Sequence, residues 1–141
     1  GSTTSTTSTT SSTTSGSTTS PPPTGNWYKV NSTLYNTIGV VGEPYGTEWS
    51  VKGGIGLNDS CIVTFASIPN AGTYTVVFFP SAPTEVSVAV MTATTAYTGM
   101  SGTVTVTILS GNRRRVVFNL PDSAEFPSGT PVTISGDMTT P

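Results

Sequence analysis

The sequence contains no histidine and a single cysteine, Cys61, and both scarcities limit its chemistry. Without histidine, neither a Ser/His/Asp nor a Cys/His catalytic arrangement can form, and metal sites built from Cys and His are excluded. One cysteine cannot form a disulfide within the chain. Cys61 lies in the apolar run 61–65, which predicts a buried and unreactive thiol.

Charged residues are also scarce, at 9% of the chain with a net charge of −2. There is no basic surplus, so we expect no nucleic-acid partner. No apolar run approaches the length of a transmembrane helix, so we expect no membrane span. The acids are scattered singly, without the pairing of a glycosidase or the spacing of a calcium loop. We therefore expect a protein that is not an enzyme and binds no metal or cofactor.

The start of the chain consists almost entirely of serine and threonine. Every residue from Ser2 to Ser20 is Ser or Thr except Gly16, and Pro21-Pro22-Pro23 follows. The Ser-Thr-Thr repeat has the three-residue period of polyproline II. A tract without apolar side chains cannot offset the entropy of ordering itself. Such composition is typical of O-glycosylated stalks, and an unmodified flexible linker is the alternative.

We therefore divide the chain into two parts. Residues 1–24 are predicted to form an extended, O-glycosylated arm, and residues 25–141 one domain. The candidate O-glycosylation sites of the arm are Ser2, Thr3, Thr4, Ser5, Thr6, Thr7, Ser8, Thr9, Thr10, Ser11, Ser12, Thr13, Thr14, Ser15, Ser17, Thr18, Thr19 and Ser20.

The second part has the pattern of a β-protein. About nine strands are expected. The first is at 26–30, with 34–35 and 38–41 as candidate continuations, and the others are at 48–51, 61–66, 73–79, 85–91, 103–108, 113–120 and 132–134, with a loop at 42–46 and a hairpin turn at 110–112. The alternation predicts that Tyr74, Val76 and Phe78 share one face. It also places Val104, Val106 and Ile108 inside, with the intervening threonines outside. The expected fold is all-β, a two-sheet antiparallel, Ig-like β-sandwich behind an extended Ser/Thr-rich N-terminal arm.

One segment carries a family resemblance. Residues 68–76, with the pattern Pro-x-x-Gly-Thr-Tyr from Pro69 to Tyr74, resemble the turn and strand of small β-sandwich domains in Bacteroidota-type cell-surface lipoproteins. The strand at 102–106, the hairpin, the Val-Val-Phe strand and the ending at 135–138 also fit, so the resemblance covers about residues 47–138. It implies a β-sandwich at the cell surface. In those domains a lipidated cysteine precedes a polar linker, whereas no cysteine precedes the arm here.

Aromatic and basic side chains supply candidate contact residues. An aromatic platform can stack on sugar rings or pack against a second subunit, and the alternative is ordinary core or half-buried strand residues. The run Arg113-Arg114-Arg115 places its first and third members on one face of a strand. They either protect a solvated edge or contact acids or sugar of a neighbour. The candidates for sugar stacking or subunit contact are Trp27, Tyr28, Tyr35, Trp49, Arg113 and Arg115.

Three further acceptor patterns occur in the domain. Asn31 and Asn58 each begin a match to the N-glycosylation pattern. Ser123, in Asp122-Ser123-Ala124, resembles a bacterial O-glycosylation site. With the arm, they indicate a secreted, sugar-bearing protein.

The expected function is structural. We expect a non-catalytic subunit of an extracellular or cell-surface filament, assembled from identical copies and bearing covalent glycans. Strand addition between copies is one way to assemble, with residues 26–41 as the better donor segment. The alternative is a carbohydrate-binding module on a Ser/Thr linker.

Overall fold

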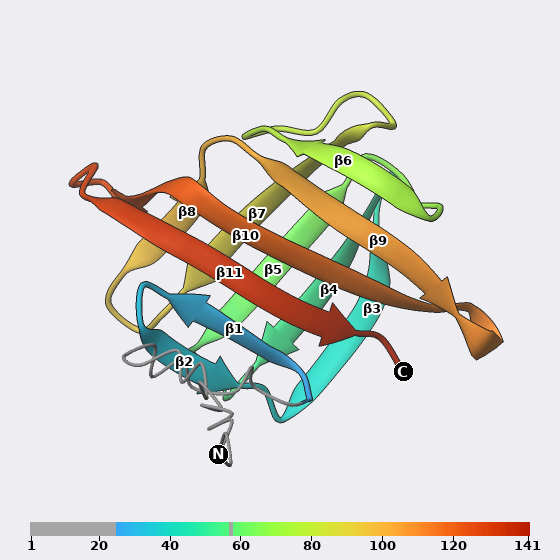
Figure 1. Ribbon diagram of the computed structural model, residues 1–141, viewed down its shortest axis with the longest axis horizontal. Helices are drawn as coiled ribbons and strands as arrows, with labels where there is room; N and C mark the ends of the chain where they lie inside the picture. The colour runs from blue at the N-terminus through green and yellow to red at the C-terminus, as the bar shows by residue number, and fades with distance from the viewer. Residues whose placement is uncertain (1–24, 57) are drawn as a thin grey trace, which may run out of the picture.

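The computed structural model describes residues 25–56 and 58–141 (Figure 1). The expected arm, 1–24, lies outside the described residues, and so do its candidate O-glycosylation sites from Ser2 to Ser20. Within the described part, the chain forms eleven strands and one short 3-10 turn, η1 (Ser110–Asn112). The expectation of an all-β domain is confirmed.

The strands follow the alternating pattern of the sequence, because β-branched side chains pack well on a pleated surface. In chain order they are β1 (Trp27–Val30), β2 (Thr33–Asn36), β3 (Gly39–Tyr45), β4 (Glu48–Gly54), β5 (Ser60–Phe65), β6 (Gly72–Val76), β7 (Glu85–Met91), β8 (Ala96–Gly99), β9 (Thr103–Leu109), β10 (Arg113–Phe126) and β11 (Pro131–Thr139).

These strands form one continuous sheet that is folded into two layers, whose strands cross at a steep angle in Figure 1. The front layer has the order β2-β1-β11-β10-β9-β6, and the rear layer continues with β7-β5-β4-β3. A short parallel pairing joins β6 to β7, and β8 pairs with both β10 and β7. Hydrogen bonds thus connect the two layers at two places, between β6 and β7 and through β8, so the sheet is continuous. The parallel pair β6–β7 makes it a mixed sheet. The two separate sheets of an Ig-like sandwich are therefore not confirmed.

The core lies between the two layers and consists mainly of valine. Val86, Val88 and Val90 of β7 face inward, opposite Val104 and Val106 of β9. The threonines that alternate with the valines of β9 are exposed, as the sequence predicts. This alternation gives the domain one apolar interior and two polar-rich outer faces.

Cys61 is completely buried in β5, as predicted. Burial raises the pKa of its thiol far above the usual value, because the charged thiolate would lose its hydration. The predicted unreactive thiol therefore has a physical basis in the fold.

The predicted position of Phe78 is wrong. Tyr74 and Val76 are buried as expected, but β6 ends at Val76 and Phe78 is 51% exposed. The bond from the Val77 amide to the Val86 carbonyl oxygen, at 2.8 Å, is the last of the β6–β7 pairing, so Phe78 lies beyond the sheet in the loop to β7. Ile108, also expected inside, is partly exposed near the end of β9.

Two segments form strands where none was expected. The predicted loop at 42–46 belongs largely to β3, which pairs with β4 as far as Tyr45. Residues 96–99 form β8, which is held by long-range pairing with β7 and β10 rather than by an alternating pattern of its own.

Candidate functional site

The strand β3 is an open edge of the sheet. Among residues 25–56 and 58–141 it is last in the strand order and pairs with β4 alone, so its other side has no strand partner within these residues. Figure 1 shows it in cyan at the end of the rear layer. Glu43 and Pro44 occupy its second half, where charge and a missing N–H discourage pairing with another chain. Its first half, Gly39–Gly42, has neither form of protection.

A groove of about 520 Å³ runs along the outer face of β3 and β4. Gly39 pairs with Gly54, and the absence of two side chains at this register leaves the hollow. Ile38 and Val41 form its apolar walls, with exposed fractions of 82% and 46%. We call this hollow the β3 groove, lined by Ile38, Gly39, Val41, Glu43, Lys52, Gly54 and Gly56.

Apolar exposure continues along the same strand. Tyr45, at the end of β3, is 80% exposed. It lines a second hollow with Glu43 and Lys52, which also border the β3 groove. Large side chains exposed in one continuous area indicate an interaction surface, whereas singly scattered ones do not. The free edge and the grooves beside it thus make one contiguous candidate contact area.

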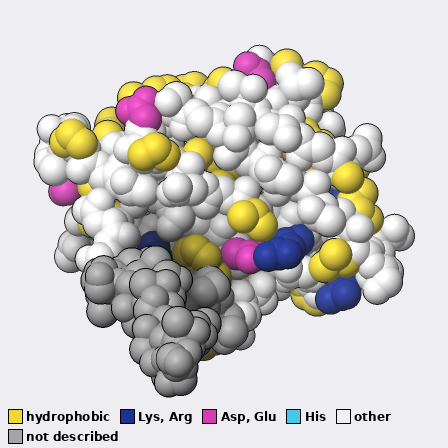
Figure 2. All heavy atoms as spheres, viewed as in Figure 1, with side chains coloured by type: hydrophobic (Ala, Val, Ile, Leu, Met, Phe, Trp, Pro, Cys, Tyr) yellow, Lys and Arg dark blue, Asp and Glu magenta, His cyan; other side chains and the backbone are white. Residues whose placement is uncertain are grey.

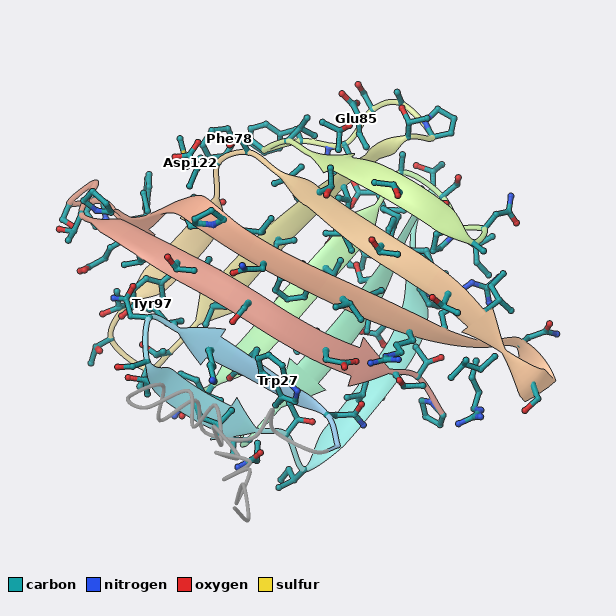
Figure 3. The ribbon with its side chains drawn as sticks, in the orientation of Figure 1. Trp27, Phe78, Glu85, Tyr97 and Asp122 are labelled. Carbon is teal, nitrogen blue, oxygen red and sulfur yellow. The ribbon has the colours of Figure 1, made fainter. Side chains whose placement is uncertain are left out.

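The loop 77–84 between β6 and β7 carries a second exposed apolar feature. Phe78 and Phe79 are 51% and 88% exposed, and we call this pair the aromatic tip. The Thr75 amide donates to the Thr84 carbonyl oxygen at 2.8 Å, which closes the base of the loop. Figure 3 shows Phe78 and Glu85 at the same end of the molecule.

Glu85 holds the second half of this loop in place. Its Oε1 accepts hydrogen bonds from the Ala82 amide at 2.8 Å, the Ser81 amide at 3.0 Å and the Ser81 hydroxyl at 3.1 Å. The backbone bond from Ala82 and the two bonds from Ser81 lower the pKa of the Glu85 carboxyl, because they stabilise its charged form. Glu85 is therefore ionised at neutral pH.

A separate groove of about 620 Å³ crosses the outer face of the front layer. Trp27 of β1 lies beside Asp137 of β11, which is in register with Val117 of β10. Asp137 accepts two hydrogen bonds from Arg115, at 2.9 and 2.6 Å. The amide of Asn119 also lines the groove. On this face, Figure 2 shows an acidic and a basic group in contact, and Figure 3 places Trp27 on the solvent side of β1.

This second groove, which we call the Trp27 groove, is lined by polar and apolar groups in equal measure. Its lining residues are Trp27, Thr103, Thr105, Val117, Phe118, Asn119, Ser135, Gly136 and Asp137. The Lys29 ammonium lies 5.5 Å from the centre of the Trp27 ring. The groove combines one aromatic ring with hydroxyl, amide and carboxylate groups, and this mixture suits a polar ligand with an apolar face.

The other predicted aromatic contact residues lie in or against the core. Tyr28 is fully buried, and its ring stacks on the half-buried Tyr35 with centroids 4.8 Å apart. Trp49 is half-buried beside Phe65, and its ring lies 5.5 Å from the Arg114 guanidinium. The structure therefore brings Trp27 and Arg115 to one surface and keeps Tyr28 away from it.

Arg113 lies apart from the Trp27 groove. It is exposed at the start of β10, and its Nε donates to the Ser110 carbonyl oxygen at 3.1 Å. This local hydrogen bond holds the side chain against the η1 turn. Of the two arginines predicted to share a face, only Arg115 bonds to a residue that lines the groove.

The three candidate acceptors of the domain differ in access. Asn31 is exposed in the turn after β1, with φ of 53°, and Asn58 is exposed before β5. Ser123 is buried, and its hydroxyl donates to the Leu120 carbonyl oxygen at 2.8 Å, next to an irregularity in the β10–β11 pairing. A glycan on Ser123 would require this part of β10 to open, because the oxygen does not reach the surface.

Among residues 25–56 and 58–141, no group of three acidic, cysteine or histidine side chains is placed to hold a metal ion. The same residues include no helix long and apolar enough to cross a membrane. Comparison with protein-family models, with curated proteins and with solved structures gives no match. The surface features are therefore what the function can be argued from.

Sequence reasoning missed the β3 groove and the aromatic tip. The groove depends on the register that places Gly39 opposite Gly54, which no local pattern reveals. The tip did have a signal, because Phe78-Phe79-Pro80 interrupts the alternation of the preceding strand with two consecutive large apolar residues.

Proposed function

We propose that this protein is a non-catalytic structural subunit of a glycosylated extracellular filament, assembled from identical copies. The observation that carries the proposal is the free edge of β3 beside the exposed side chains of Ile38, Val41 and Tyr45. An open strand edge is a template for pairing with another chain, and the adjacent grooves offer apolar area for the same partner. Both features lie in one contact area.

The composition supports a homopolymer. A chain with 9% charged residues and a net charge of −2 has little electrostatic repulsion between copies. The predicted glycosylated arm keeps such an assembly hydrated at its surface. Contacts between different patches on successive copies need not close into a ring, so they build fibres.

The proposal is tested by placing a charge on the contact area. In Val41→Lys, a lysine stands at the exposed edge, where charges prevent pairing between chains. We expect the concentration at which assembly begins to rise about tenfold or more, which corresponds to a loss of ~1.4 kcal/mol per contact. Light scattering on a concentration series measures this threshold.

The matched control is Val117→Lys, because Val117 is an exposed strand valine on the opposite layer. We expect its assembly threshold to equal that of the unmodified chain. Equal thresholds for all three proteins would contradict the proposal that the β3 edge forms the contact.

The Trp27 groove favours a second candidate function, which is binding of a neutral polysaccharide. An indole ring stacks on the apolar face of a sugar, while Asn119 and Asp137 are placed to hydrogen-bond its hydroxyl groups. We expect retention on an insoluble polysaccharide to be lost in Trp27→Ala and kept in Tyr45→Ala, which removes an exposed aromatic ring elsewhere on the surface. Retention that is equal in both variants would exclude the groove as the binding site.

A further inference from the structure

The outer face of the front layer carries two rows of side chains that run across the strands. In the first row, Trp27 of β1 pairs with Asp137 of β11, which pairs with Val117 of β10. Val117 pairs in turn with Thr105 of β9, and Thr105 with Thr73 of β6. Side chains in register on one face of a sheet are neighbours. The row therefore extends over five strands, from an indole ring at one end to threonine hydroxyl groups at the other.

The second row lies beside the first, two residues along each strand, which is about 6.6 Å away. It begins at Lys29 of β1, which pairs with Ser135 of β11. Ser135 pairs with Asn119 of β10, and Thr103 of β9 pairs with Thr75 of β6. Beyond β1, this row offers hydroxyl and amide groups at the ~4.8 Å spacing of neighbouring strands.

The Trp27 groove follows these rows. Its lining residues belong to β1, β11, β10 and β9, so the groove crosses the strands instead of running along one of them. Three strand spacings of ~4.8 Å give it a length of about 14 Å, and the threonines of β6 continue the same surface. Figure 2 shows the surface over the middle of β9 in white, the colour of uncharged polar side chains and backbone.

The backbone under the groove is already hydrogen-bonded within the sheet. The strands β1, β11, β10 and β9 each pair with a strand on both sides. A ligand on this face therefore contacts side chains, whereas a peptide strand binds through the backbone of a sheet edge. Hydroxyl groups both donate and accept hydrogen bonds, so the threonines and Ser135 match a ligand that is itself covered with hydroxyl groups.

The carboxylate in the groove is compensated by a cation of the same chain. Asp137 accepts two hydrogen bonds from Arg115, at 2.9 and 2.6 Å. This bidentate pair fixes the orientation of the carboxylate and leaves little net charge to attract an ion. The Lys29 ammonium lies over the Trp27 ring rather than among the lining residues. The charges therefore favour a neutral ligand.

We propose that the Trp27 groove binds an extended neutral polysaccharide chain that crosses the strands. One sugar ring stacks on Trp27, and the following rings lie over Asn119 of β10 and Thr103 of β9. This inference rests on the second candidate function and adds the path and the length of the ligand.

Affinity electrophoresis of the full chain tests the class of ligand. The gels contain hydroxyethylcellulose, xylan or galactomannan as neutral polymers, and polygalacturonate as the acidic one. We expect retardation by at least one neutral polymer, its loss in Trp27→Ala, and no retardation by polygalacturonate. Free migration in every neutral gel would overturn both the inference and the second candidate function. Stronger retardation by polygalacturonate would overturn the neutral ligand.

Calorimetric titration with oligosaccharides of the retained polymer tests the length. A chain gains contacts at each strand that it crosses, so we expect the affinity to rise about tenfold or more from the disaccharide to the hexasaccharide, which corresponds to ~1.4 kcal/mol. An affinity that is the same for all lengths would overturn the extended path and leave the second candidate function standing.

A pair of threonine variants tests the path. Thr103→Val keeps the shape of the side chain and removes one hydroxyl group from the β9 end of the groove. We expect it to weaken binding of the hexasaccharide about two- to tenfold and to leave the disaccharide unaffected, because a disaccharide held at Trp27 does not reach β9. The matched control is Thr107→Val, which changes an exposed threonine of the same strand outside the groove lining. Equal affinities of the two variants for the hexasaccharide would contradict a path across the strands.

Discussion

Tyr28 is the largest fully buried side chain among the described residues. Its hydroxyl finds no hydrogen-bond partner within that part of the chain. A buried polar group without a partner costs roughly 1–3 kcal/mol. The ring is well placed, because it stacks on Tyr35 with an angle of 12° between the planes. The packing of the Tyr28 ring therefore stabilises the fold, whereas its unpaired hydroxyl destabilises it.

Replacing Tyr28 with phenylalanine keeps the ring and removes the unpaired group. We expect the free energy of unfolding of Tyr28→Phe to be unchanged or up to about 1 kcal/mol higher, as measured by urea denaturation. The control is Tyr74→Phe, because the Tyr74 hydroxyl donates to the Asn70 carbonyl oxygen at 2.8 Å. That variant should lose about 1 kcal/mol. Equal losses in the two variants would mean that the Tyr28 hydroxyl is hydrogen-bonded.

Cys61 makes the free energy of unfolding of the domain fall at alkaline pH. Burial raises the pKa of its thiol, so the native chain keeps a proton that the unfolded chain loses above about pH 8.5. Its contribution is fully present below that pH and falls as the pH rises, with a slope that approaches about 1.4 kcal/mol per pH unit. Urea denaturation between about pH 7.5 and 9.5 should show this decline in the native sequence and not in Cys61→Ala. Parallel curves for the two proteins would contradict it.

At the scale of a strand, Gly136 sets how β10 and β11 pack. Gly136 pairs with Phe118 of β10 and Tyr28 of β1. A Cβ at this position would lie 2.5 Å from Cζ of Phe118, so the buried ring would have to move. The glycine therefore provides the space that Phe118 fills in the core.

We expect Gly136→Ala to lower the free energy of unfolding by about 1–3 kcal/mol, the usual cost of overpacking. Gly39→Ala is the control, because a Cβ at Gly39 meets no atom within 4 Å. Thermal unfolding of the two variants measures the difference. Equal stability of the two variants would show that the core around Phe118 accommodates the added methyl group without a loss of stability.

Most of the strands were predictable because each has its own local signal. The alternation of valine and threonine in β7 and β9 fixes which side faces inward, and the turn at 110–112 lies where predicted. Strand β8 was not predictable, since residues 96–99 become a strand only through partners on β7 and β10. The continuous sheet was missed for the same reason, because the β6–β7 junction is a long-range contact.

The candidate site was predictable only in part. Trp27 and Arg115 were identified from their residue types, and the structure adds Asp137 between them through the pairing of β1, β11 and β10. Ile38 and Val41 look like ordinary strand residues in the sequence. They become a contact surface because β3 is an edge, and no local pattern tells an edge strand from a central one.

At the scale of the whole molecule, the proposed assembly depends on the surfaces through which copies contact each other. The domain has an aromatic tip at one end and an apolar groove beside a free strand edge at the other.

Electron microscopy of the full chain over a rising concentration series tests the central claim most directly. The account predicts filaments of repeating subunits above a threshold concentration, and their loss at the same concentration in Val41→Lys. A uniform population of single particles at the highest concentration would contradict it.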